Sequence, residues 1–481
     1  MVKIFSNQAF EISTNFGTSV VEGNLTSLPQ GPGELLQFSF NQLQNIYKTV
    51  YIQITPVSGQ TADFWDILWS NKVGGEPADQ FALSKFVNAS GGKFQIQINS
   101  DRYAEQKVET FSIRVYASSL DAVNGNAPLA QTTFTIVDDD RAQFTSSGPA
   151  VSANFNPANG WTSQDKFARH IADVNGDGYA DIVGFGAAGV LVSNGSANGT
   201  FSGAGLVAAN FGQDSGWTSD NQFHRELADV NGDGRADIIG FGYAGTLVSL
   251  AKADGSFTGA STGLADFGFN QGWANQNGFA RTVGDVNGDG NADIIGFGYA
   301  GTLVAIGNGD GTFQPVKTAI SNFGMNQGWS SDDQFHREAA DVNGDGKTDI
   351  VGFGIAGTYV ALSNGDGTFA GAQLVLQNFG ANQGWTSNDS FTRHVIDVNG
   401  DNMADVVGFG AAGTLIAYGT SDGTFTAPVF DLADFGKAQG WTSDNTFHRE
   451  IADVNNDGLA DIVGFGISGV LIASNHGDLL F

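Results

Sequence analysis

Asp173-Val-Asn-Gly-Asp-Gly-Tyr-Ala-Asp181 recurs in six variants along this 481-residue chain, beginning at residues 173, 229, 285, 341, 397 and 453. Successive copies start 56 residues apart each time. Self-similarity at a fixed period of this length indicates a repeat architecture in which each copy is one structural unit. The stretch and its interval therefore decide the fold.

Each copy also carries the chemistry of a hard-cation site. Oxygen-bearing side chains stand at positions 1, 3, 5 and 9 of the nine-residue loop, and position 7 can add its backbone carbonyl. Calcium prefers six to eight oxygen ligands, and glycine lets the backbone curl around one ion. The sequence therefore predicts six calcium loops, numbered here in chain order as cation loops 1 to 6. The predicted ligands, with the fourth of each set acting through its carbonyl, are Asp173, Asn175, Asp177, Tyr179 and Asp181; Asp229, Asn231, Asp233, Arg235 and Asp237; Asp285, Asn287, Asp289, Asn291 and Asp293; Asp341, Asn343, Asp345, Lys347 and Asp349; Asp397, Asn399, Asp401, Met403 and Asp405; and Asp453, Asn455, Asp457, Leu459 and Asp461.

The loop sequence allows two alternatives to this metal site. An EF-hand needs a bidentate glutamate at position 12 and flanking helices, but position 12 is glycine in every copy and the flanks look like strands. A tight hairpin without metal is the other alternative, but without a cation three carboxylates at fixed spacing repel one another. Asn402 and Asn456 replace a glycine in loops 5 and 6, so those two loops are expected to bind calcium more weakly.

The unit around each loop reads as four antiparallel strands. In the second copy these are residues 223–228, 236–242 and 246–250 and a strand beginning at Phe257. Four strands in a unit of this length predict a propeller blade, whereas a parallel β-helix needs a shorter period. The last copy lacks its fourth strand, and matching sequence occurs at residues 143–151. Residues 141–481 are therefore predicted to form a six-bladed β-propeller closed by its N-terminal strand.

Residues 1–140 lack the repeat and alternate apolar with polar residues, for example over 93–98, 110–116 and 132–137. Period-two runs without a helical period predict a β-sandwich. Three features of this region resemble the Calx-β family. They are a Val-x-Glu-Gly motif that includes Val21-Glu22-Gly23, the Asp101…Glu105…Glu109-Thr-Phe111 segment, and a run of three aspartates after the last strand. The resemblance implies calcium ligands, although an acidic linker remains the alternative for the final aspartate. The implied ligands are Glu22, Asp101, Asp138, Asp139 and Asp140.

Composition limits the classes of partner. The chain has 21 Lys and Arg against 50 Asp and Glu, a net charge of -29, which argues against nucleic acid and anionic membranes. It has no cysteine, and no stretch reaches the ~18 apolar residues of a membrane helix. The N-terminus lacks the apolar run of a Sec signal peptide. We expect an extracellular or cell-surface protein exported by another route.

The propeller repeat carries a second resemblance. Asp-x-Asn-Gly-Asp-Gly-x-x-Asp followed by Phe-Gly resembles the FG-GAP or VCBS repeat of integrin α propellers. The longer string Asn-Phe-Gly…Gly-Trp…Phe-x-Arg before the loop resembles the fungal lectins of the Psathyrella velutina type. Those propellers have seven blades, whereas this sequence predicts six. The resemblance implies binding of N-acetylglucosamine-type or sialic-acid-type glycans in pockets between blades.

Strand reversal places the cation loops on one face and the tryptophan-bearing connections on the other. Trp and Arg recur once per blade, but only blades 2, 4 and 6 read Trp-x-Ser-Asp-x-x-Phe-His-Arg-Glu. We hypothesise that these blades supply the sugar sites. The alternatives are that Trp wedges blades apart, that Arg satisfies carbonyls or a carboxylate, and that the pairing only records duplication. The candidate ligand-binding residues are Trp217, Asp220, His224, Arg225 and Glu226; Trp329, Asp332, His336, Arg337 and Glu338; and Trp441, Asp444, His448, Arg449 and Glu450.

The leading functional prediction is a calcium-dependent lectin or adhesin that binds glycans, with a possible cell-surface or matrix partner. The alternative is a calcium-stabilised structural or protein-interaction module without sugar sites. An enzyme is not predicted, because the sequence has no G-x-S-x-G element, no histidine-rich cluster and no unique pair of acids.

Overall fold

The computed structural model describes residues 142–145 and 148–477, and within residues 1–141 it describes ten strands together with Arg114 and Pro128. The chain divides into two compact units, Met1–Arg141 with Gly477–Phe481, and Ala142–His476. Each unit is described separately below.

The first unit contains two five-stranded sheets. The strands predicted over 93–98, 110–116 and 132–137 correspond to β8 (Lys93–Ile98), β9 (Glu109–Tyr116) and β10 (Ala130–Val137). The described strands of this unit pair antiparallel, except that β10 is parallel to β3 (Ser19–Val21). The Calx-β ligands Glu22, Asp101, Asp138, Asp139 and Asp140 lie outside the described residues and stay predictions. In sheet order the strands are β1 (Lys3–Ile4), β2 (Ile12–Thr14), β4 (Leu35–Phe40), β8 (Lys93–Ile98) and β6 (Ile67–Trp69), and then β3 (Ser19–Val21), β10 (Ala130–Val137), β9 (Glu109–Tyr116), β5 (Thr49–Pro56) and β7 (Leu83–Asn88).

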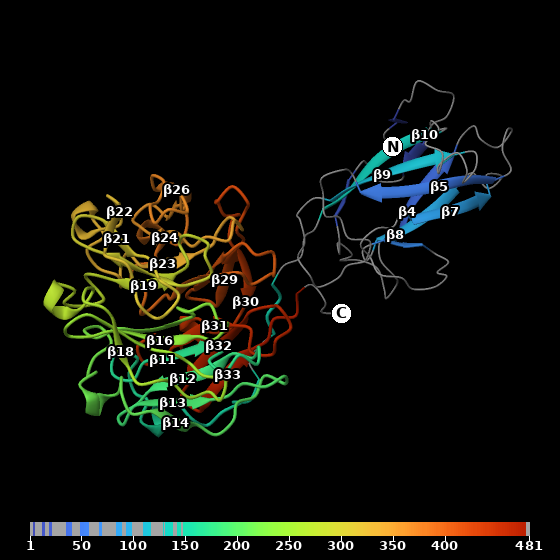
Figure 1. Ribbon diagram of the computed structural model, residues 1–481. Helices are drawn as coiled ribbons and strands as arrows, with labels where there is room; N and C mark the ends of the chain where they lie inside the picture. The colour runs from blue at the N-terminus through green and yellow to red at the C-terminus, as the bar shows by residue number, and fades with distance from the viewer. Residues whose placement is uncertain are drawn as a thin grey trace. The chain divides into compact units, whose positions relative to one another are not determined.

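The second unit is built from six antiparallel sheets, one for each repeat (Figure 1). The first strands of neighbouring blades contact one another around a closed ring. This confirms the all-β, six-bladed propeller. Blades 1 to 6 consist of β11 (Arg169–Ala172), β12 (Asp181–Phe185), β13 (Val190–Ser193) and β14 (Gly205–Ala208); β15 (Arg225–Ala228), β16 (Asp237–Phe241), β17 (Thr246–Ser249) and β18 (Ser261–Leu264); β19 (Arg281–Gly284), β20 (Asp293–Phe297), β21 (Thr302–Ala305) and β22 (Lys317–Ile320); β23 (Arg337–Ala340), β24 (Asp349–Phe353), β25 (Thr358–Ala361) and β26 (Gln373–Leu376); β27 (Arg393–Ile396), β28 (Asp405–Phe409), β29 (Thr414–Ala417) and β30 (Val429–Leu432); and β31 (Arg449–Ala452), β32 (Asp461–Gly466) and β33 (Gly469–Ala473).

The fourth strand starts later than the sequence indicated. In blade 2, Phe257 forms an isolated bridge with Ala251, and β18 begins at Ser261. A register shift follows where β18 pairs with β17. The aromatic residue after the third-strand turn thus anchors the turn, and the pairing of the fourth strand contains a bulge.

The sixth blade is completed by the segment before blade 1. Phe144 forms an antiparallel bridge with Asn475, and Ser152 forms one with Val470. The Val470 N–H donates to the Ser152 carbonyl over 2.8 Å, and the Val151 N–H donates to the Val470 carbonyl over 2.8 Å. The predicted closure is confirmed, and it covers the edge that β33 would otherwise expose.

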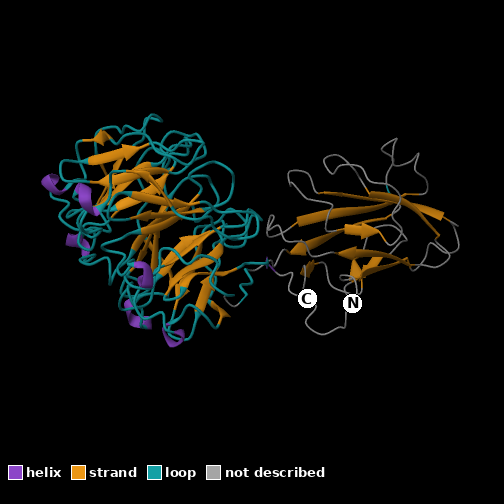
Figure 2. Cartoon of the chain, turned by 90° about the horizontal axis from the view of Figure 1, so that it is seen from below, coloured by secondary structure: helices purple, strands orange, loops and turns teal. Residues whose placement is uncertain are grey.

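A short 3-10 turn precedes the tryptophan of each blade, and Figure 2 shows these turns along one face of the propeller. Two residues before the start of each turn lies a fully buried phenylalanine with a left-handed backbone, with φ between 56° and 60°. In blade 4 this residue is Phe323, whose N–H donates to the Asn322 side chain over 2.7 Å. Its ring packs against Trp329 with centroids 5.0 Å apart. The Asn-Phe-Gly sequence thus turns the chain back into the core.

The core lies between neighbouring blades. Ile295 and Phe297 of blade 3, for example, share one cluster with Phe323, Trp329 and Ile350 of blade 4. Since burial of large apolar side chains is the main stabilising contribution, each blade depends on its neighbours for stability.

Substitution of Gly352 by alanine is predicted to destabilise the propeller by about 1 to 3 kcal/mol, since overpacking a filled core costs this much. A Cβ there would lie 2.6 Å from Trp329 Cη2 and 2.7 Å from Phe323 Cε1. The matched control is Gly371→Ala in the same blade, where a Cβ meets no atom within 4 Å. Denaturant unfolding of the two variants measures the difference, and equal stabilities would contradict the packing described.

Candidate functional site

The predicted Asp/His/Arg/Glu set of blades 2, 4 and 6 forms one hydrogen-bonded chain in each blade. In blade 4, Asp332 Oδ2 lies 2.7 Å from His336 Nδ1, and His336 Nε2 lies 2.9 Å from Glu338 Oε1. The Arg337 Nε–H donates to Asp332 Oδ1 over 3.2 Å. Blades 2 and 6 repeat these contacts with Asp220, His224, Arg225 and Glu226, and with Asp444, His448, Arg449 and Glu450.

The arginines of this set are buried. Arg337 is 2% exposed, and its Nη1 donates to the carbonyl of the left-handed Phe323 over 3.0 Å. Its guanidinium carbon also lies 5.1 Å from the ring centre of Phe297 in the preceding blade. The same contacts recur at Arg225 and Arg449. They favour the alternative that these arginines satisfy carbonyls and a carboxylate, and sugar binding by them stays a prediction. Each one fixes a carbonyl and joins two blades.

The tryptophans are buried as well. Trp217, Trp329 and Trp441 are 5%, 8% and 6% exposed and pack between a phenylalanine and a strand glycine. Trp329 belongs to the apolar cluster that blade 4 shares with Ile295 and Phe297 of blade 3. This burial favours the alternative of a wedge between blades, and sugar binding by the tryptophans stays a prediction.

The odd and even blades contact each other through these polar chains. In blades 1, 3 and 5 the arginine pairs with a neutral amide, as in the bond from Arg169 Nε to Gln164 Oε1. Glu450 of blade 6 also contacts His170 of blade 1 over 3.0 Å, and Glu338 contacts His394 of blade 5 over 3.2 Å. Thr282 stands at the matching position of blade 3. The three two-blade units are therefore similar and not identical.

Charge pairing shifts the titration of this network. Burial alone would lower the pKa of His336, but the Asp332 and Glu338 carboxylates outweigh it and raise that pKa to about 9. The pKa values of His224 and His448 rise to about 9 for the same reason. Burial opposes ionisation of Glu338, yet His394 and His336 lower its pKa to about 2. The histidines are thus imidazolium cations at neutral pH.

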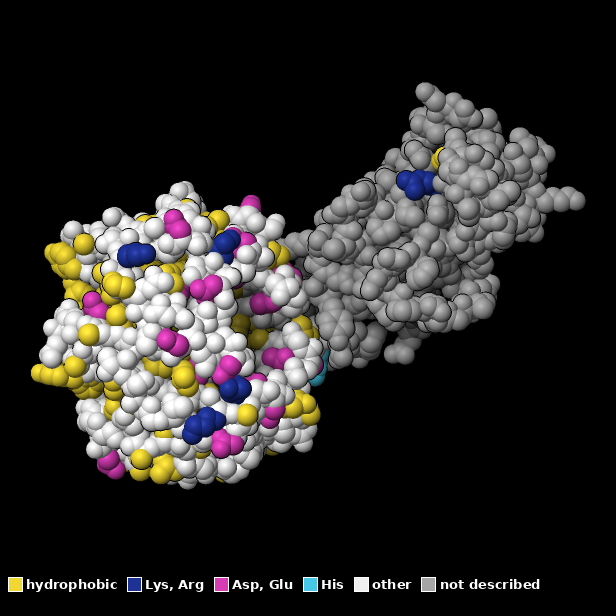
Figure 3. All heavy atoms as spheres, in the orientation of Figure 1, with side chains coloured by type: hydrophobic (Ala, Val, Ile, Leu, Met, Phe, Trp, Pro, Cys, Tyr) yellow, Lys and Arg dark blue, Asp and Glu magenta, His cyan; other side chains and the backbone are white. Residues whose placement is uncertain are grey.

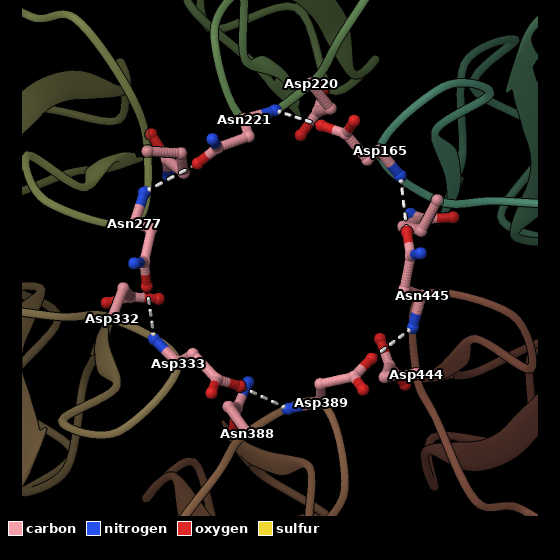
Figure 4. A pocket seen from close by; sticks show the side chains of 12 residues that line it. Asp165, Asp220, Asn221, Asn277, Asp332, Asp333, Asn388, Asp389, Asp444 and Asn445 are labelled. Carbon is pink, nitrogen blue, oxygen red and sulfur yellow. Dashed lines mark hydrogen bonds between the residues drawn. The ribbon is translucent and has the colours of Figure 1, made fainter.

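Three of the candidate acids, Asp220, Asp332 and Asp444, reach a polar pocket on the propeller axis, a cavity of about 230 Å³ (Figure 4). No basic residue lines it. The other lining residues are Gln164, Asp165, Asn221, Gln276, Asn277, Asp333, Asn388, Asp389 and Asn445.

A closed circle of hydrogen bonds surrounds this pocket. Asp165 Oδ1 of blade 1 accepts from the backbone N–H of Asn221 in blade 2 over 2.8 Å. Equivalent bonds of 2.8 to 2.9 Å link every blade to the next and return from Asn445 to Asp165. Sequence reasoning missed this circle, although an Asp or Asn recurs there every 56 residues. Its members are Asp165, Asn221, Asn277, Asp333, Asp389 and Asn445.

The cation loops are compact turns built on their first aspartate. In loop 1, Asp173 accepts backbone N–H groups from Asn175, Gly176 and Gly178 at 2.7 to 3.1 Å. The ninth residue, Asp181, is fully buried at the start of β12 and accepts from the Val174 and Gly195 N–H groups. The other five loops repeat the bonds to the first and ninth residues.

The loop residues fit a calcium ion in type. Their side chains and the carbonyl at position 7 are oxygen donors, and in loop 5 the Asn399 Oδ1 is a buried acceptor without a hydrogen-bond partner. Among the described residues, no three His, Asp or Glu side chains are gathered as a metal cluster. The position-3 amide lies against a loop carboxylate, as in the 2.9 Å bond from Asn287 Nδ2 to Asp289 Oδ2. Binding would require that amide to turn its oxygen toward the ion.

The face that carries the 3-10 turns also exposes aromatic rings. Tyr243 and Tyr299, in the turns between the second and third strands of blades 2 and 3, are 60% and 63% exposed. Tyr243 stacks on Phe269 of the next connection, with centroids 5.6 Å apart and planes 13° apart. The Asn270 N–H donates to the Tyr243 carbonyl over 3.0 Å and fixes the two turns together. Sequence reasoning missed these tyrosines, because only two blades carry them.

Comparison with known proteins agrees with this architecture. The model for the FG-GAP-like repeat matches residues 173–240, 229–296, 285–352 and 341–407. A lectin of Agrocybe aegerita, described as specifically recognising non-reducing terminal N-acetylglucosamine, is 40% identical over 68% of this chain and 83% of the lectin, with a TM-score of 0.56. The fold and repeats define an FG-GAP-repeat β-propeller. The chain belongs to the propeller family that includes this lectin.

More distant similarities add nothing to the functional argument. The Photorhabdus luminescens Tc holotoxin pore is 14% identical over 83% of this chain and 19% of that one, with a TM-score of 0.47. The Vibrio cholerae biofilm matrix protein Bap1 is 17% identical over 60% and 43%, with a TM-score of 0.24. The comparison with curated proteins gave no match to this chain. In the part of the chain that the structure describes, no helix is long and apolar enough to cross a membrane.

The three buried histidines predict a loss of stability in mild alkali. Since their folded-state pKa of about 9 exceeds the unfolded value of 6.5, their contribution is complete below pH 6.5 and is lost as pH rises through 9. We expect about 1 to 3 kcal/mol per histidine. Thermal unfolding of a His224→Gln, His336→Gln, His448→Gln variant should show a flatter profile over that range. His476→Gln, at an exposed position, is the control, and identical profiles in all three proteins would contradict the pairing.

Proposed function

We propose that this protein is a lectin, a non-catalytic carbohydrate-binding protein, whose ligands are glycans ending in N-acetylglucosamine-type sugars. The observation that carries the proposal is the 40% identity to the Agrocybe lectin over 83% of that chain. A cell surface or an extracellular matrix is where such glycans are met, and the strongly acidic chain suits a partner without negative charge.

The proposed sugar contacts lie between blades, on the face with the 3-10 turns. The Asp, His, Arg and Glu candidates from the sequence are engaged in internal hydrogen bonds, whereas the side chains of Tyr243 and Tyr299 are exposed and their carbonyls accept from Asn270 and Asn326. Sugar sites commonly combine an aromatic surface with a few fixed polar groups. Several weak sites on one rigid ring would bind a multivalent glycan surface through avidity.

A second candidate function is protein binding without sugar. Ile355 and Ile467 occupy the tyrosine position in blades 4 and 6 and are 59% and 70% exposed. With the two tyrosines they give this face four exposed apolar side chains, a composition that also suits a protein partner.

Removal of the two rings tests the sugar proposal. We expect Tyr243→Ala with Tyr299→Ala to lower binding to immobilised N-acetylglucosamine about tenfold, since loss of one aromatic contact of ~1.4 kcal/mol has this effect. The control is Phe430→Ala, which removes an equally exposed ring, 54% accessible, from an outer strand. Unchanged binding by the double variant would refute the tyrosine sites. Failure of the wild type to bind any glycan on an array would favour the protein-binding alternative.

We further propose that calcium stabilises the propeller through the cation loops. Ions that bind only the folded state add stability by mass action, about 2.7 kcal/mol per site at one hundred times Kd. The melting temperature should therefore fall by several degrees when calcium is removed with EGTA and recover when calcium is returned. Magnesium at the same concentration is the control, because it prefers a smaller octahedral site. A melting temperature insensitive to EGTA would refute this proposal.

A further inference from the structure

The six cation loops differ at position 7, and two of them carry a positive charge there. Arg235 of loop 2 forms an ion pair through Nη2 with Asp233 Oδ2, and Lys347 of loop 4 places Nζ 2.9 Å from Asp345 Oδ2. The position-5 carboxylate of these two loops is thus already paired with a positively charged side chain of the same loop. Position 7 is uncharged in the other four loops, where it is Tyr179, Asn291, Met403 and Leu459.

Loops 5 and 6 have no positive charge at position 7, and each contains a buried amide oxygen without a hydrogen-bond donor. Asn399 of loop 5 is 7% exposed, and its Oδ1 has no hydrogen-bond partner, although its Nδ2 lies 3.2 Å from Asp401 Oδ2 among the loop carboxylates. Asn455 Oδ1 of loop 6 is likewise buried without a partner. A buried oxygen acceptor without a donor is costly, and a cation would satisfy it.

In the other four loops this amide oxygen is already occupied. Asn175, Asn231, Asn287 and Asn343 each accept the N–H of the position-5 aspartate through Oδ1, over 2.8 to 3.2 Å. The two loops with an unpartnered oxygen are those in which asparagine replaces a glycine. Asn402 and Asn456 take up left-handed backbone with φ of 62° and 58°, so the turn itself is preserved.

Loop 5 is also accessible. A cavity of about 600 Å³ opens between loops 4 and 5, and Asp341, Asp397 and Asn402 are among its lining residues. A hydrated ion can therefore reach the first aspartate of loop 5 from solvent.

We propose that loops 5 and 6 are the tight calcium sites of the propeller, and that loops 2 and 4 hold no calcium while Arg235 and Lys347 neutralise them. The inference rests on the proposed calcium binding and reverses the order expected from the glycine replacements. A unit positive charge within a few ångströms of a divalent ion opposes its binding, so we expect loops 2 and 4 to stay empty at calcium concentrations that fill loops 5 and 6.

Calcium titration of the full chain by calorimetry tests this order. Apart from ions held by the predicted ligands in residues 1–140, the wild type should bind fewer than six ions, two of them most tightly. Arg235→Gln with Lys347→Gln should add two sites, whereas the matched position-7 control, Tyr179→Phe with Asn291→Gln, should leave the number unchanged. Asn399→Ala should weaken one tight site at least tenfold, and Asn399→Asp should keep it because the carboxylate supplies an oxygen.

The outcomes distinguish failure of the proposed ranking of the loops from failure of the proposed calcium binding. Six equivalent sites in the wild type, or an unchanged count in the Arg235/Lys347 variant, would overturn the ranking and leave calcium stabilisation intact. Absence of calcium binding in the wild type and in every variant would overturn both. Melting temperatures in EGTA show that each variant is folded before its titration is compared.

Discussion

The propeller depends on a buried guanidinium in every blade. Each arginine begins the first strand, bonds the carbonyl of a phenylalanine fourteen residues earlier, and lies over a phenylalanine ring of the preceding blade. It therefore stabilises a left-handed backbone that a bulky residue adopts at a cost. A truncated arginine would leave that carbonyl unsatisfied in the core. Because the tryptophan packs on the same phenylalanine, both repeated residues are buried inside the molecule.

The alternating blade types divide charge unevenly around the ring. In even blades the arginine faces an aspartate, whereas in odd blades it faces glutamine or asparagine, so burial lowers the pKa of Arg169, Arg281 and Arg393 to about 10. Carboxylates of the preceding even blade partly compensate for this, among them Asp444 and Glu450 beside Arg169. Electrostatically, the stable unit is thus a pair of neighbouring blades.

Period and strand pattern predicted the number of blades and their closure, because both follow from local sequence. They could not decide what Trp329 and Arg337 do, since a residue that recurs once per blade can face the core or the solvent. That choice depends on Phe323, whose left-handed turn directs the chain inward. The circle through Asp165 and Asn221 was missed for another reason: its partners lie 56 residues apart, in different blades. The metal ligands were chosen by residue type, and calcium itself remains a prediction.

The circle of side-chain oxygens around the axis has a consequence for how such a molecule can be cut and rejoined. Every link runs in the same direction, from one blade to the amide of the next, so no link marks a first or last blade. The opening of the ring lies at the outer seam of the sixth blade, where Ser152 meets Val470. A gene in which the propeller's two ends are fused and the opening is moved to another outermost strand would encode the same ring. The circle of hydrogen bonds around the axis fixes the order of the blades, and it leaves the position of the chain opening free to vary.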